Sequence, residues 1–90
     1  MRMSKDQKVD LVYRLIILYK SQNDGLSPPL RWLGKELAKL TWSDTPVSLS
    51  VISTYIDALV DDGRIERHGS GKKRRIKVVG AAWIASDGWR

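Results

Sequence analysis

Turn-forming sequences divide this chain into short segments, and that division restricts its possible folds more than any other feature. The breaks are Asn23-Asp24-Gly25, Ser27-Pro28-Pro29, Ser43-Asp44 with Thr45-Pro46, and Asp61-Asp62-Gly63. Glycine, proline and short polar side chains favour turns, so we expect no helix or strand to cross these points. Apolar residues recur at helical spacing before the last break and alternate with charged residues after it. The sequence therefore predicts a mainly helical α+β fold with three helices and a C-terminal two-stranded β-hairpin.

The first expected helix runs from Ser4 to about Gln22 and ends near Gly25, which can adopt a left-handed conformation. Ser4 and Gln7 have the spacing of a capping box, in which each side chain accepts a hydrogen bond from the other's backbone N–H. The apolar stripe consists of Leu11, Val12, Leu15, Ile16, Leu18 and Tyr19. The charged residues expected mostly on the opposite side are Lys5, Lys8, Asp10, Arg14 and Lys20.

A second helix is expected from Leu30 to Leu40, with Leu33, Leu37 and Leu40 on one face. A glycine inside a helix costs about 1 kcal/mol relative to alanine, so we interpret Gly34 as a site of close helix–helix packing. The third expected helix begins at Ser48 or Leu49 and reaches Asp62, and its buried stripe contains Ile52, Ile56 and Leu59.

The hairpin is expected to pair residues 64–67 with residues 75–79, placing Ile65, Ile76 and Val78 on the core face. With 42% hydrophobic residues, the 90-residue chain can form one small core. We therefore expect one domain over residues 1–80 and a short tail over residues 81–90. In that tail, Trp83 and Trp89 either cover the open end of the core or form a homodimer contact.

The positive charge is concentrated in the hairpin. Residues 63–79 contain seven basic residues and one acidic residue, a difference that equals the net charge of +6 of the whole chain. The basic residues are Arg64, Arg67, Lys72, Lys73, Arg74, Arg75 and Lys77, and the acidic one is Glu66. Such a cluster either is a solvated surface or binds a polyanion, and we favour the polyanion because phosphate contacts release condensed counterions.

Composition narrows the possible chemistry. The chain has no cysteine and one histidine, which excludes disulfides, thiolate metal sites and paired histidine ligands, so we expect no metal and no cofactor. No apolar run approaches the roughly 20 residues of a membrane span and no secretion signal begins the chain, so we expect a cytoplasmic protein.

We also expect no enzymatic activity. His68 lies in a glycine-rich tip, where we expect no carboxylate to orient it as a general base. Asp61 and Asp62 at a helix end are interpreted as solvent-facing rather than as a metal pair. The sequence from Gly69 to Lys72 lacks both the spacing and the strand-to-helix context of a phosphate-binding loop.

Three helices followed by a basic hairpin form the winged helix-turn-helix arrangement, and five short sequences carry a more specific resemblance. They are Gly25-Leu26-Ser27-Pro28-Pro29, Leu33-Gly34-Lys35-Glu36-Leu37, Ser48-Leu49-Ser50-Val51-Ile52, the run from Leu59 to Arg67, and Arg74-Arg75-Ile76-Lys77-Val78. In their order and spacing, residues 25–78 resemble the N-terminal DNA-binding domain of LexA-like repressors and, more loosely, MarR-like winged helices. LexA-like repressors continue into a self-cleaving serine–lysine domain, and we expect no such cleavage switch here.

The resemblance implies a double-stranded DNA-binding protein that represses transcription by occluding polymerase. It places the third helix in the major groove and the hairpin, or wing, on the backbone or minor groove. The residues expected to contact DNA are Ser48, Ser50, Ser53 and Thr54 on the third helix, Arg31 and Lys35 on the second, and Arg67, Lys72, Lys73, Arg74 and Arg75 in the wing. Lys39 is a further candidate for a phosphate contact, and for each serine helix capping is an equally valid interpretation.

The early half of the third helix has no Arg, Lys, Asn or Gln, so we expect modest sequence specificity, with the affinity coming mainly from the wing. Trp32 and Trp42 are expected to pack in the core or a loop rather than to stack on bases. The alternative function is a winged-helix protein-interaction module, for example one that binds a host protein. Binding to single-stranded nucleic acid is less favoured, because no aromatic and basic residues alternate on a sheet.

Overall fold

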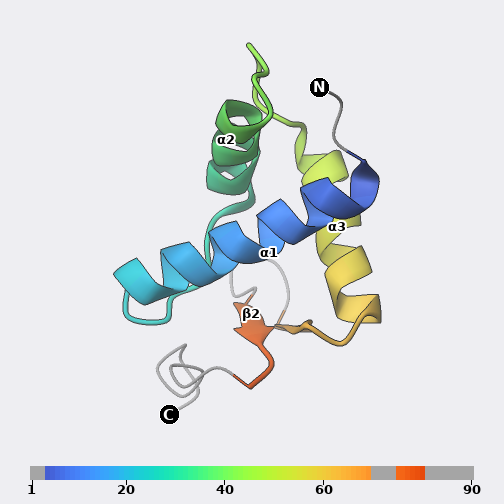
Figure 1. The fold of residues 1–90 in the computed structure, drawn as a ribbon. Coiled ribbons are helices and arrows are strands. Elements are labelled where there is room, and N and C mark those ends of the chain that lie inside the picture. The colour runs from blue at the N-terminus through green and yellow to red at the C-terminus, as the bar shows by residue number, and fades with distance from the viewer. Residues whose placement is uncertain (1–3, 70–74, 81–90) are drawn as a thin grey trace.

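The computed structural model describes residues 4–69 and 75–80 (Figure 1). Its elements, in chain order, are α1 (Lys5–Gln22), α2 (Leu30–Leu40), α3 (Leu49–Asp61), β1 (Ile65–His68) and β2 (Arg75–Val78). α1 runs across the molecule, α2 and α3 pack against it and against each other, and the hairpin lies near the C-terminal end of α3 (Figure 1). The predicted fold class is confirmed: three helices precede an antiparallel hairpin, which is the layout of a winged helix.

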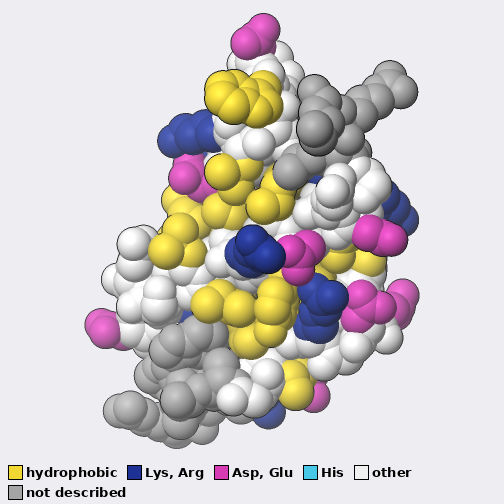
Figure 2. All heavy atoms as spheres, in the orientation of Figure 1, with side chains coloured by type: hydrophobic (Ala, Val, Ile, Leu, Met, Phe, Trp, Pro, Cys, Tyr) yellow, Lys and Arg dark blue, Asp and Glu magenta, His cyan; other side chains and the backbone are white. Residues whose placement is uncertain are grey.

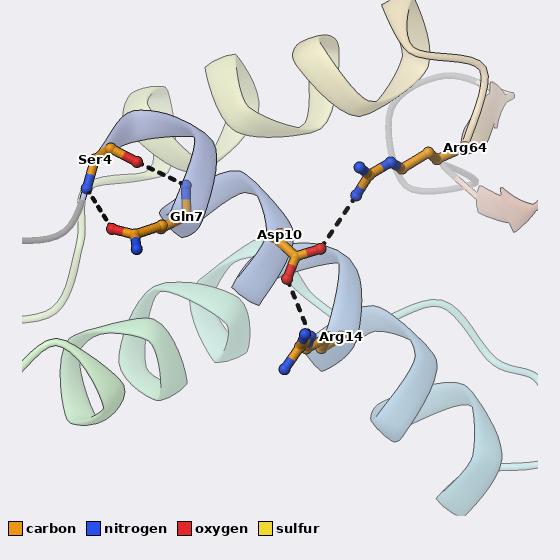
Figure 3. A network of polar contacts seen from close by, with 5 residues as sticks. All are labelled: Ser4, Gln7, Asp10, Arg14 and Arg64. Atoms are coloured by element: carbon orange, nitrogen blue, oxygen red, sulfur yellow. Dashed lines mark hydrogen bonds and ion pairs between the residues drawn. The ribbon is translucent and has the colours of Figure 1, made fainter.

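Local sequence signals account for the ends of the helices. The capping box at the start of α1 is present: the Ser4 N–H donates to Gln7 Oε1 at 2.8 Å, and the Gln7 N–H donates to Ser4 Oγ at 3.2 Å (Figure 3). Gly25 has a φ of 83° after α1, and Gly63 has a φ of 75° after α3, a region that favours glycine. Both turns are where the sequence predicts them.

The hairpin is shifted slightly from its predicted boundaries. β1 begins one residue later, at Ile65, and the register pairs Ile65 with Val78 and His68 with Arg75. The side chains of Ile65, Ile76 and Val78 are buried, as predicted from their alternation with charged residues. The wing is therefore attached to the helical core by one apolar face.

One core joins all five elements. Its buried residues are Val9, Val12, Leu15, Ile16, Leu33, Leu37, Ile52, Ile56, Leu59, Ile65, Ile76 and Val78. α1 packs against both α2 and α3, and α3 also packs against β1. Leu18 and Leu40, which the periodicity assigns to apolar faces, are 44% and 46% exposed because they lie at the edges of these contacts.

Lys20 corrects the prediction for α1. The sequence analysis places it with the solvent-facing charges, but its side chain is fully buried. It follows Ile16 by four residues and therefore lies on the buried stripe. Its Nζ donates to the carbonyl of Gly25 at 2.8 Å, so the ammonium group stabilises the turn that ends α1.

Gly34 is a site of close packing, but its neighbour is a loop rather than a helix. A Cβ at this position would lie 2.5 Å from the carbonyl oxygen of Val47. The Val47 N–H also donates to the Gly34 carbonyl at 3.1 Å. The backbone contact therefore fixes the residue that immediately precedes Ser48, the N-cap of α3.

The side chain of Ser27 covers the outer edge of β2. The Ile76 N–H donates to Ser27 Oγ at 2.7 Å, and Ser27 Oγ lies 3.4 Å from the Ile76 carbonyl oxygen. The connector between α1 and α2 is thus joined to the wing. The two residues are 49 positions apart, so no local sequence pattern predicts this contact.

Candidate nucleic-acid interface

The N-terminal half of α3 presents short hydroxyl side chains. Ser48, Ser50 and Thr54 are exposed, and Ser53 is half-buried. Ser48 Oγ accepts from the Val51 N–H at 3.4 Å, and Thr54 Oγ1 donates to the Ser50 carbonyl at 3.0 Å. Ser48 therefore caps the N-terminus of α3, which is the capping role given above as the alternative to DNA contact. Ser50 and Thr54 are exposed, so their hydroxyl oxygens lie at the surface.

Arg67 reaches from β1 onto the surface of α3. Its Nη1 donates to Asp57 Oδ1 at 2.5 Å, and its Nη2 donates to Ser53 Oγ at 3.1 Å. The side chains of Arg67 and Asp57 remain 40% and 60% exposed, so this pair lies at the surface. The sequence predicts Arg67 and Ser53 as separate contact residues, and the structure joins them directly by a hydrogen bond. Asp57, which was not among the predicted residues, binds the same guanidinium.

One carboxylate, that of Asp10 on α1, pairs with two arginines, Arg64 at the base of the wing and Arg14 on α1 itself. Arg64 Nη1 lies 3.2 Å from Asp10 Oδ1, and Arg14 Nε lies 3.0 Å from Asp10 Oδ2 (Figure 3). The Arg64 guanidinium lies 5.3 Å from the centre of the Tyr13 ring, which adds a cation–π contact. Figure 2 accordingly shows acidic side chains beside basic ones on this face, rather than a continuous basic surface.

His68 corrects a second prediction. Its Nε2 lies 3.0 Å from Glu66 Oε1, so a carboxylate does contact this histidine. The contact forms because β1 extends to His68, so Glu66 and His68 lie two residues apart on one strand and share a face. The hydrogen bond from His68 lowers the pKa of Glu66 below its usual value, and the charge of Lys77, with Nζ at 3.7 Å, lowers that pKa further.

Three predicted contact residues carry charge without a carboxylate partner among residues 4–69 and 75–80. They are Arg31 and Lys35, both exposed on α2, and Arg75 at the start of β2. Lys39 differs, because its Nζ lies 2.9 Å from Glu36 Oε2. The predictions for Lys72, Lys73 and Arg74 concern the sequence that joins β1 to β2, and they lie outside the described residues, as do those for Trp83 and Trp89.

The two remaining tryptophans behave differently from each other. Trp32 packs against the core and meets Tyr19 edge to face, with ring centres 4.9 Å apart, as predicted for a packing residue. Trp42 is 93% exposed, so the prediction that it packs in the core or a loop is wrong. Trp42 lies two residues after the end of α2 and has a φ of 59°, in the left-handed region.

Within the described part of the chain, no group of three or more His, Cys, Asp or Glu residues is placed to hold a metal ion. None of the helices in that part is long and apolar enough to cross a membrane. Comparison of the chain with family models, with curated proteins and with solved structures gives no match. The LexA-like resemblance therefore stays a prediction from the sequence.

Proposed function

We propose that this protein binds double-stranded DNA and regulates transcription by occluding a promoter. The N-terminal half of α3 enters the major groove, and the wing and α2 contact the phosphate backbone on either side. The layout of the fold supports this arrangement, because the helix of a helix-turn-helix unit fits a B-form major groove and its neighbours then meet phosphates.

One observation carries the proposal: the predicted contact residues that have no carboxylate partner among residues 4–69 and 75–80 lie on α2 and on the wing, both of which pack against α3. Arg31 and Lys35 lie on α2, and Arg75 lies on β2 beside the basic run Lys72-Lys73-Arg74 of the sequence. α3 itself has no charged residue before Asp57. A neutral hydroxyl surface with cations on α2 and on the wing beside it suits a groove lined by phosphates.

The test is a titration of labelled duplex DNA at several salt concentrations, comparing the wild type with the double variant Lys73→Glu/Arg74→Glu. We expect the variant to bind much more weakly and the slope of log affinity against log salt to fall by about 2, because two phosphate contacts are lost. The matched control is Lys5→Glu/Lys8→Glu, which makes the same charge change at the start of α1. Equal losses in both double variants, or none in either, would contradict the proposal.

Exposed apolar residues favour a second candidate function, a protein-interaction module. Trp42, Leu40 and Leu49 are 93%, 46% and 49% exposed, and all three lie at or beside the turn between α2 and α3. Exposed aromatic residues are enriched where proteins meet other proteins. A stable partner recovered from nuclease-treated lysate by the wild type but not by Trp42→Ser, together with no duplex binding, would favour this function over DNA binding.

A further inference from the structure

The helix proposed to enter the groove has no side chain of its own that can read a base pair by two hydrogen bonds. Residues 49–56 are Leu, Ser, Val, Ile, Ser, Thr, Tyr and Ile, and their hydroxyls are short. Discrimination among base pairs in the major groove depends mostly on Arg, Lys, Asn and Gln. A base-reading group at the surface of α3 therefore has to come from another element of the fold.

Arg67 meets this requirement. It lies in β1, opposite Ile76, so the strand register fixes where its backbone stands relative to α3. Its guanidinium contacts two side chains one helical turn apart on α3, with 3.1 Å to Ser53 Oγ and 2.5 Å to Asp57 Oδ1. The strand thus places a planar, charged donor group on the surface of the helix.

The two contacts orient the guanidinium without using all of its donors. An arginine has five N–H groups, and the bonds to Ser53 and Asp57 use two of them. The fork formed by neighbouring N–H groups matches the O6 and N7 acceptors of guanine, which is the commonest specific contact in the major groove. The Asp57 carboxylate also offsets the charge of Arg67, so this arginine adds little to binding that does not depend on sequence.

Resting on the proposed function, we infer that Arg67 is the residue that determines sequence specificity, by reading a guanine in the groove occupied by α3. Asp57 is its positioning residue, because it holds the guanidinium against the helix. The proposed base reader therefore comes from the wing, while the helix supplies the surface on which it is held.

The test is selection from random duplexes followed by affinity measurements for the wild type, Arg67→Lys and Arg64→Lys. We expect the wild type to enrich a guanine at one position and to prefer it over other bases by about tenfold. Arg67→Lys keeps the charge but loses the fork, so it should lose this preference while its affinity for random duplex stays within about twofold. Arg64→Lys is the matched control, because Arg64 pairs with Asp10 on α1 and not with α3; it should keep the preference.

A second pair of variants tests Asp57. Asp57→Ala and Asp61→Ala each remove one exposed carboxylate from α3, but Asp57 is the one bonded to Arg67. Both should raise the affinity for random duplex, and only Asp57→Ala should reduce the guanine preference.

The outcomes separate the two proposals. A wild type that binds duplex DNA without a guanine preference, or an Arg67→Lys variant that selects the same sequence as the wild type, would overturn the role of Arg67 and leave DNA binding intact. Loss of the preference in both arginine variants, or in both aspartate variants, would overturn it as well. A wild type that binds no duplex at all would overturn the proposed function too.

Discussion

Replacing Gly34 by alanine sets two opposing effects against each other. Alanine is favoured over glycine in the interior of a helix by about 1 kcal/mol, so helix propensity alone predicts a more stable protein. The structure predicts the opposite, because the added Cβ would lie 2.5 Å from the carbonyl oxygen of Val47. Real Cβ contacts are essentially never closer than 3.0 Å, so the loop backbone has to move by about half an ångström or more.

The size of the effect follows from three contributions. Overpacking against backbone costs about 2 kcal/mol, and loss of the 3.1 Å hydrogen bond from the Val47 N–H to the Gly34 carbonyl costs about 1 kcal/mol. The higher helix propensity of alanine stabilises the folded state by about 1 kcal/mol. Gly34→Ala should therefore lower the free energy of unfolding by about 2 kcal/mol. For a chain of this size that corresponds to a fall in Tm of roughly 8–16 °C.

Thermal and urea denaturation followed by circular dichroism measure this change, with Lys35→Ala on the same turn of α2 as the exposed control. Because Val47 immediately precedes the N-cap of α3, the displacement should also weaken duplex binding. A Gly34→Ala protein as stable as the wild type, or more stable, would refute the close contact.

Three further predictions concern other buried or paired groups. Lys20→Met should lower the free energy of unfolding by about 1–3 kcal/mol in urea denaturation, because the Gly25 carbonyl, in the turn after α1, loses a buried charged donor; an unchanged or higher value would contradict this role. Ser27→Ala should cost about 1–2 kcal/mol and speed amide hydrogen exchange at Ile76, whose N–H loses its acceptor; unaltered exchange would disprove the contact. The pKa of Glu66 is lowered, so its contacts contribute stability above about pH 4.5 that is lost as the pH falls through the folded pKa. An NMR titration should show that pKa rising in His68→Ala, and no rise would exclude the hydrogen bond as its main cause.

The sequence was sufficient for the elements whose ends depend on neighbouring residues. The capping box of Ser4 and Gln7, the left-handed turns at Gly25 and Gly63, and the alternation of the hairpin are all set by residues within a few positions of each other. These features are local, so helix and strand boundaries agree with the prediction to within a residue or two.

Features that depend on residues far apart in the chain were not predicted. Arg64 pairs with Asp10 across 54 residues, and Ser27 reaches Ile76 across 49. The spacing of Lys20 from Ile16 indicates a buried position, whereas its charge indicates an exposed one, and the sequence alone does not show the Gly25 carbonyl that accepts from its Nζ. For the candidate site, the sequence identified the chemical types of residue, whereas the grouping of Ser53 with Arg67 depends on how the strand crosses the helix.

The hydroxyl of Ser27 also affects whether the edge of β2 can pair with a strand of another molecule. A strand at the border of a sheet can recruit a strand from another molecule, which is a common start of fibril growth. Here one serine occupies the amide of Ile76 and approaches its carbonyl, so a second molecule cannot extend the sheet at that position. Ser27 therefore protects the Ile76 position of the β2 edge against addition of a strand from another molecule.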